Sequence, residues 1–109
     1  MDSPAVIGSL AALAQQSRLA IFRLLVETGP AGLAVGDIGA GLDVSPATLS
    51  FHLKELATAG LIIARQQGRF VYYSANYERM NSLIAYLTEN CCGRGKSRCA
   101  PQPLKETRR

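Results

Sequence analysis

The chain has 109 residues, of which 48% are hydrophobic, and it carries a formal net charge of +4 at pH 7. This length and composition predict one compact domain with a modest core that gains stability by dimerising. There is no run of about 18 apolar residues, and the start lacks the basic segment of a signal peptide, so we expect a cytoplasmic protein with no membrane partner. The sequence offers no paired carboxylates and no nucleophile grouping, which argues against an enzyme.

The charge is unevenly distributed along the chain. Residues 94–109 carry six basic side chains against the single acid Glu106, a net charge of +5, so the rest of the chain has a net charge of −1. A basic, proline-containing stretch of this kind is typical of a solvated tail. We therefore expect a folded domain over residues 1–92 and a basic, partly disordered tail over residues 93–109. Nucleic-acid binding has to be argued from the folded domain.

Apolar residues at helical spacing predict three helices in the first half of the chain. The first opens near Ser3, which can cap it, and Pro4, which fits its first turn. The second runs from about Ser17 to Thr28 and ends at a Gly-Pro pair. The third is short and runs from about Val35 to Leu42.

A fourth predicted helix begins at Pro46, with Ser45 as its N-cap, and continues to about Ala59. Its leucines form a buried stripe, while its first two turns are otherwise small and polar. An α-helix fits the major groove, reads base edges near its N-terminus and offers free N–H groups to a phosphate. The residues expected to meet DNA from this helix are Ser45, Ala47, Thr48, Ser50, Phe51, His52 and Lys54. For His52 a structural hydrogen bond is the open alternative.

Residues 61–67 and 70–75 are rich in β-branched and aromatic side chains and flank a Gly-Arg pair, which predicts a hairpin with a basic tip. A short helix, a longer polar helix and such a hairpin make a winged helix-turn-helix. Arg65 and Arg69 are then placed to meet backbone phosphate or a minor groove. The alternative is an ordinary α+β domain whose hairpin only covers the core.

A fifth helix is predicted after the cap Asn76, and its apolar positions follow a 3-4-3-4 spacing: Tyr77, Met80, Ile84, Leu87 and Cys91. A core stripe within one chain would give the same spacing. The first helix, however, offers a second apolar face that includes Leu10 and Leu13, so we expect a homodimer. Its two recognition helices would lie about 34 Å apart and read an imperfect palindrome in double-stranded DNA. The expected fold is mainly α (α+β), five helices with a two-stranded β-hairpin wing.

The stretches over residues 33–38, 44–56 and 59–62 resemble the ArsR/SmtB family of bacterial metal-responsive repressors, and the resemblance covers residues 5 to 92. It implies a dimer that binds operator DNA and releases it when a metal or metalloid binds. Arsenic sensors of that family carry C-V-C-D-L in the third helix, where this chain has A-V-G-D-I and no thiol. Zinc and nickel sensors use Asp and His ligands on the last helix, but the only histidine here is His52.

The only cysteines of the chain are Cys91, Cys92 and Cys99, in a stretch too polar for a core. They resemble the thiols that arsenite-responsive members of the family carry just past the last helix. Three thiolates satisfy trigonal-pyramidal As(III), whereas structural zinc needs a fourth ligand. As(III) is the expected inducer, with Sb(III) and methylated As(III) left open. We expect the last helix to end near Asn90 so that both adjacent thiols converge.

Nearby basic side chains favour the thiolate form, which metal binding and thiol oxidation both require. A thiol-redox-sensing regulator of the same fold is therefore the alternative, with Cys91 or Cys92 oxidised and Cys99 resolving. A small thiol oxidoreductase is disfavoured because the chain has no C-x-x-C motif.

Overall fold

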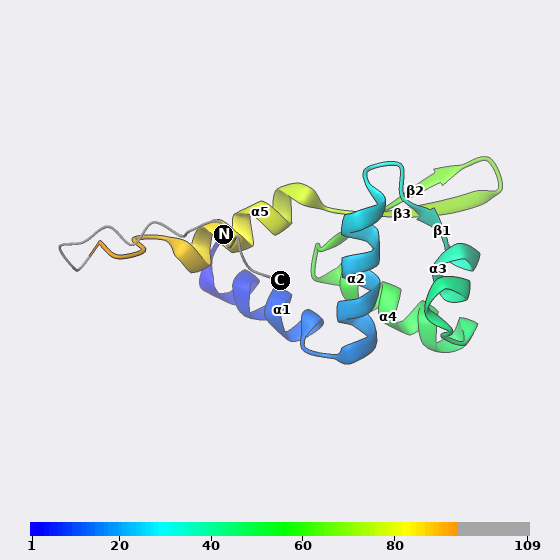
Figure 1. Ribbon diagram of the computed structural model, residues 1–109, viewed down its shortest axis with the longest axis horizontal. Helices are drawn as coiled ribbons and strands as arrows, with labels where there is room; N and C mark the ends of the chain where they lie inside the picture. Colours follow the sequence, from blue (N-terminus) through cyan, green and yellow to red (C-terminus); the bar gives the residue numbers. More distant parts are fainter. Residues whose placement is uncertain (94–109) are drawn as a thin grey trace.

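The structure, a computed structural model, describes residues 1–93. The predicted tail and Cys99 therefore lie outside the described residues, apart from Gly93. In chain order the elements are α1 (Ser3–Leu13), α2 (Gln16–Thr28), β1 (Leu33–Ala34), α3 (Val35–Leu42), α4 (Pro46–Thr58), β2 (Ile62–Gln67), β3 (Phe70–Ala75) and α5 (Tyr77–Thr88) (Figure 1). Five helices and a small antiparallel sheet form the winged helix-turn-helix that the sequence predicted.

Side-chain caps fix where the helices begin. Asp2, not Ser3, caps α1, because its Oδ1 accepts from the backbone N–H of Ala5 at 3.0 Å. Gln15 caps α2 in the same way, so that helix starts one residue earlier than predicted. The predicted caps of α4 and α5, Ser45 and Asn76, are confirmed. Each cap satisfies a backbone N–H that the helix leaves without a partner.

The sheet has three strands in the order β1-β3-β2: β2 and β3 form the predicted two-stranded hairpin wing, and β1 is an additional strand that the sequence analysis did not predict. The missed strand β1 is only two residues long and pairs Leu33 with Tyr73. The turn before it brings Gly32 so close to β3 that a Cβ there would collide with the Tyr73 carbonyl oxygen, and Gly32 has a φ of 77°. Glycine adopts that left-handed conformation without steric cost.

The core lies between α2, α3, α4 and the inner ends of the sheet. Its buried side chains are Ala12, Ile21, Phe22, Leu25, Ile38, Leu49, Leu53, Leu56, Leu61, Ile62 and Ala75. Each fully buried leucine or isoleucine contributes about 1.5 to 3 kcal/mol. The three leucines of α4 are all at most 2% exposed, so this cluster fixes which face of α4 is left for solvent.

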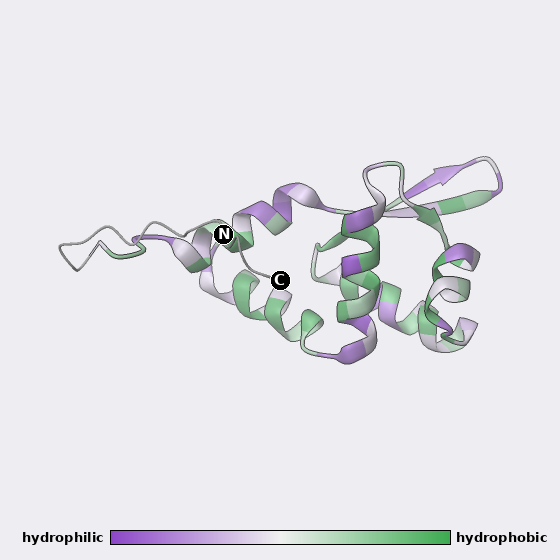
Figure 2. Ribbon diagram, in the orientation of Figure 1, coloured by the Kyte–Doolittle hydropathy of each residue, from purple (hydrophilic) through white to green (hydrophobic). Residues whose placement is uncertain are grey.

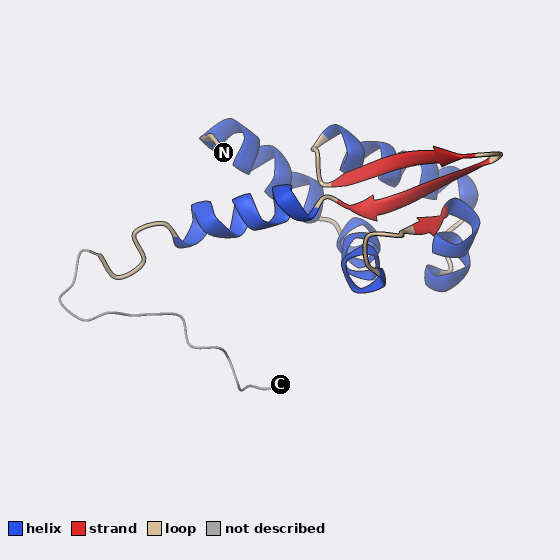
Figure 3. Cartoon of the chain, turned by 90° about the horizontal axis from the view of Figure 1, so that it is seen from above, coloured by secondary structure: helices blue, strands red, loops and turns tan. Residues whose placement is uncertain are grey.

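Helices α1 and α5 lie side by side at one end of the molecule, and the hairpin extends at the other (Figures 1 and 3). Figure 2 shows α1 hydrophobic along most of its length, although only part of it is buried. Within residues 1–93 no single helix is long and apolar enough to span a membrane, and only α1 and α2 taken together, across a bend of 101°, have that length and composition.

Candidate DNA-binding surface, dimer face and thiol site

Helix α4 buries a stripe of leucines and leaves its remaining, mostly polar side chains exposed. Six of the seven positions that we expected to meet DNA are exposed, namely Ser45, Ala47, Thr48, Ser50, Phe51 and Lys54. At the start of the helix the Ser45 hydroxyl donates to Thr48 Oγ1 at 3.0 Å and accepts from the Thr48 backbone N–H at 3.4 Å. Thr48 Oγ1 accepts that bond, so the hydroxyl proton of Thr48 takes no part in it.

The seventh position, His52, does not belong to this surface. Its side chain is only 6% exposed, and its Nδ1 lies 3.3 Å from Nη1 of Arg18 in α2. The expectation of a DNA contact is corrected to the structural hydrogen bond that the sequence left open. Position 52 follows Leu49 by three residues, so helical periodicity places it on the buried face, and this spacing was the signal that could have found it.

The two arginines of the wing have different surroundings. Arg65 donates through Nη2 to the carbonyl oxygen of Ala31 at 3.2 Å and to Gln67 Oε1 at 3.3 Å, and its guanidinium lies 5.4 Å from the centre of the Tyr72 ring. Within the described residues the Arg69 side chain, at the exposed tip, makes no hydrogen bond or ion pair. Arg69 is therefore exposed at the wing tip without a side-chain bond to the described residues, whereas Arg65 ties β2 to the turn before β1.

The predicted dimer seam divides into two sets of residues. Tyr77, Met80 and Leu13 lie partly buried against the core of their own chain, and their contact with a second protomer stays a prediction. Leu10, Ile84 and Leu87 are 42%, 51% and 57% exposed, as a dimer face requires. The sequence analysis missed two further residues. Ile7, beside Leu10, is 63% exposed and adds to the exposed apolar face, whereas Leu83 is buried within its own chain. Exposed apolar side chains gathered on two adjacent helices mark an interaction surface.

Helix α5 ends at Thr88, two residues before the predicted end, so Cys91 does not continue its apolar face. The chain then makes two turns, in which Cys91 N–H donates to the Thr88 carbonyl at 2.9 Å and Gly93 N–H to the Asn90 carbonyl at 2.9 Å. The Sγ atoms of Cys91 and Cys92 lie 3.5 Å apart. Within residues 1–93 no group of three metal-binding side chains occurs, and the third expected ligand, Cys99, lies beyond them.

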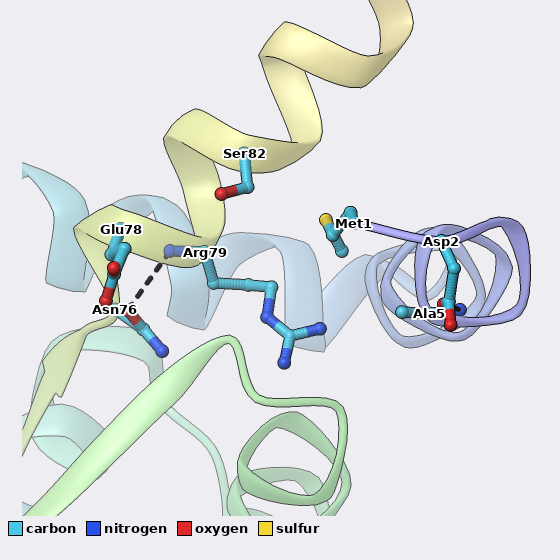
Figure 4. A pocket seen from close by; sticks show the side chains of 7 residues that line it. All are labelled: Met1, Asp2, Ala5, Asn76, Glu78, Arg79 and Ser82. Carbon is cyan, nitrogen blue, oxygen red and sulfur yellow. Dashed lines mark hydrogen bonds between the residues drawn. The ribbon is translucent and has the colours of Figure 1, made fainter.

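The start of α5 is held against the turn that follows the recognition helix. Asn76 Oδ1 accepts from the Arg79 N–H at 3.1 Å, and Asn76 Nδ2 donates to the Gly60 carbonyl at 2.9 Å. The Arg79 side chain extends towards that turn along a cavity of about 380 Å³, which the start of α1 lines on its other side (Figure 4). Gly60 has a φ of 80°, which favours glycine, and a Cβ there would lie 2.8 Å from the flexible end of the Arg79 side chain.

The fold and the exposed recognition helix define a winged helix-turn-helix DNA-binding protein. The sequence matches the helix-turn-helix domain family over residues 13–64. It is 38% identical over 81 residues to the arsenical resistance operon repressor of Bacillus subtilis, covering 74% of this chain and 73% of that protein. It is 31% identical to the arsenical resistance operon repressor of Escherichia coli, covering 81% of this chain and 90% of that protein.

Among solved structures, the homodimeric winged helix-turn-helix domain of Mb0332 from Mycobacterium bovis, a possible ArsR-family regulator, is similar to this chain with a TM-score of 0.63. The two are 26% identical over 87% of this chain and 88% of that one. The chain belongs to the ArsR family of helix-turn-helix transcriptional regulators. The relatives are transcriptional regulators rather than enzymes.

Proposed function

We propose that this protein is a homodimeric repressor that binds operator DNA when free of metalloid and releases it when As(III) binds the thiolates of Cys91, Cys92 and Cys99. The observation that carries the proposal is the position of Cys91 and Cys92 just past α5, with sulfur atoms 3.5 Å apart. Cys92 is disulfide-bonded in the structure, so its thiolate becomes a ligand only after reduction. Two relatives that cover most of this chain are arsenical resistance repressors, which supports the choice of inducer. Sb(III) also takes three thiolates and methylated As(III) takes two, and both are tested beside arsenite.

DNA reading is assigned to α4 and the wing. Thr48 and Ser50 supply hydroxyl groups to base edges, while Lys54, Arg65 and Arg69 supply charge to the phosphates. A dimer formed through the α1 and α5 faces presents two such surfaces, so the operator is an imperfect palindrome with half-sites one helical turn apart, about 34 Å.

Inducer binding at the C-terminal end of α5 affects the recognition helix α4 through the contacts at the N-terminal end of α5. There Asn76 bonds the Gly60 turn that directly follows α4, and Ile84 and Leu87 lie between that turn and the thiols. As(III) weakens operator binding only to the extent that its affinity differs between the free and the DNA-bound protein. Couplings between such sites are typically about 1 to 3 kcal/mol, which corresponds to about 5- to 150-fold.

The test is a titration of labelled operator DNA with the full chain under reducing conditions, with and without arsenite. We expect tight binding without arsenite and binding about 5- to 150-fold weaker at saturating arsenite. Unchanged operator affinity at saturating arsenite contradicts the inducer assignment. A parallel titration after peroxide treatment separates the alternative, because a thiol-redox sensor of this fold releases DNA after oxidation and is restored by a thiol reductant.

A further inference from the structure

Arg18, in the first turn of α2, joins its own helix to two others, α1 and α4. Its Nε donates to the carbonyl oxygen of Ala12 near the end of α1 at 2.7 Å. Its Nη1 lies 3.3 Å from Nδ1 of His52 in the middle of α4. Its backbone N–H donates to the cap residue Gln15 at 2.8 Å. The side chain is only partly exposed, so these bonds form with reduced competition from water.

Both acceptors are groups that need this donor. Because α1 ends at Leu13, the Ala12 carbonyl is one of the last four of the helix, which have no partner within it, and a cation is favourable there. A guanidinium has donors only, so His52 Nδ1 must be the acceptor and carries no proton in this bond. His52 is 6% exposed, and a buried imidazole nitrogen without its donor is costly.

We propose that Arg18 is a positioning residue for operator recognition, which sets the orientation of α4 relative to α1. Helix α1 carries the exposed dimer residues Ile7 and Leu10, and α4 carries the exposed base-reading residues. The Arg18 bonds therefore connect the surface that sets the spacing of two protomers with the surface that reads the sequence. This inference rests on the proposed operator binding of the dimer.

Loss of these bonds has a distinctive signature. Base-edge hydrogen bonds are short and directional, so a rotated recognition helix loses them first. Attraction to phosphates depends on charge and distance and tolerates the same rotation. Arg18 variants are therefore expected to lose discrimination between operator and random DNA, which a loss of stability alone does not produce in the folded fraction.

The experiment measures the affinity of full-length variants for operator and for random DNA at equal salt, together with thermal melting and sedimentation. Arg18→Met keeps the apolar stem and removes all side-chain donors, and His52→Leu removes the acceptor. Each is expected to weaken operator binding by about 10-fold or more and random-DNA binding by less than about 3-fold. The double variant is expected to be no worse than either single variant, because the two side chains act as one unit.

Three further variants make the result decisive. Arg23→Met removes the same charge from α2 at a side chain that is 72% exposed, and its ratio of operator to random-DNA affinity is expected to stay at the wild-type value. His52→Asn places an amide oxygen near the position of Nδ1 and is expected to restore most of the discrimination. Arg18→Lys keeps the charge but cannot span both acceptors. It takes the place of Arg18→Met in the comparison if Arg18→Met does not fold.

The proposal is overturned if Arg18→Met and Arg18→Lys, as folded dimers, keep the wild-type affinity ratio. It is also overturned if Arg23→Met lowers the ratio as much as they do. A wild-type protein that shows no preference for the operator contradicts the proposed function itself, and that result is separate from the comparison between variants.

Discussion

The Tyr77 hydroxyl lies 2.9 Å from the carbonyl oxygen of Val26 and so joins the first residue of α5 to the last turn of α2. Because α2 ends at Thr28, the Val26 carbonyl accepts no hydrogen bond from its own helix. The bond fixes the start of α5 to the core of its own chain. In the far half of α5, Leu83 is buried, while Ile84 and Leu87 are 51% and 57% exposed.

We predict that the double variant Ile84→Lys, Leu87→Lys dissociates the dimer without unfolding the chain. Burial of one such side chain is worth about 1.5 to 3 kcal/mol, so each substitution should raise the dimer dissociation constant about 10-fold or more. Sedimentation equilibrium measures the constant and far-ultraviolet circular dichroism checks the fold. A double variant that remains as dimeric as the wild type would place the dimer face elsewhere.

Tyr77→Phe is the matched control for that experiment. It removes the bond to the Val26 carbonyl but keeps the aromatic ring against the core. The free energy of unfolding should fall by about 1 kcal/mol, the usual net value of one hydrogen bond. The dimer dissociation constant should stay unchanged, since the ring belongs to the packing of one chain.

A second prediction separates base reading from phosphate contact. Thr48→Ala and Ser50→Ala should each cost about 1 to 3 kcal/mol on the operator and little on random DNA. Arg69→Ala should weaken binding to both DNAs and reduce the salt dependence by about one charge. Binding isotherms at several salt concentrations measure both effects. Equal losses on both DNAs for all three variants would show that α4 is not the reading element.

The sequence predicted α4 and the hairpin well because their signals are local. The Ser45-Pro46 start and the leucine at position 49 specify a capped helix with one buried stripe, and the structure buries that leucine to 1% exposure. Strand β1 was missed because two residues carry no periodicity. It exists only through pairing with Tyr72 and Tyr73, about forty residues further along the chain.

The roles of individual polar residues were harder to predict than the elements that hold them. The contact between Arg18 and His52 joins residues 34 positions apart, so no local sequence pattern predicts it. The exposed positions of α4 follow from its buried stripe, and they were predicted well. The same periodicity also places His52 inward, although a polar side chain is more often found at the surface.

A third prediction concerns the turn before β1. Gly32→Ala should destabilise the fold by more than about 1 kcal/mol, because alanine strains a φ of 77° and its Cβ meets the Tyr73 backbone. Gly36→Ala is the control, since a Cβ at that helical position meets nothing within 4 Å. It should change stability by at most about 1 kcal/mol in the favourable direction. Urea unfolding measures both, and equal effects would contradict the argument.

A fourth prediction concerns the thiols. Cys91→Ser, Cys92→Ser and Cys99→Ser should each keep the wild-type affinity for operator, because Cys91 and Cys92 follow the end of α5, away from the exposed face of α4. Each should require a higher arsenite concentration for release, since a hydroxyl does not replace a thiolate ligand. Operator titrations at stepwise arsenite concentrations measure the shift. If all three variants respond at the wild-type concentration, the three-thiol site is wrong, whereas a dispensable Cys99 alone is compatible with a methylated As(III) inducer held by two thiols.

The final prediction follows from linkage between the thiols and the DNA surface. If arsenite weakens operator binding by a given factor, saturating operator must weaken arsenite binding by the same factor, about 5- to 150-fold. The Asn76 bond to the Gly60 carbonyl lies on the route between the two sites, so Asn76→Asp, which keeps the cap oxygen and removes the Nδ2 donor, should reduce that factor. Arsenite affinity is measured by competition with a thiol-reactive dye, with and without operator, for the wild type and the variant. An arsenite affinity of the wild type that operator leaves unchanged refutes the coupling. Sedimentation of the loaded protein shows whether release proceeds within an intact dimer, as the exposed Ile84 and Leu87 predict, or by its dissociation.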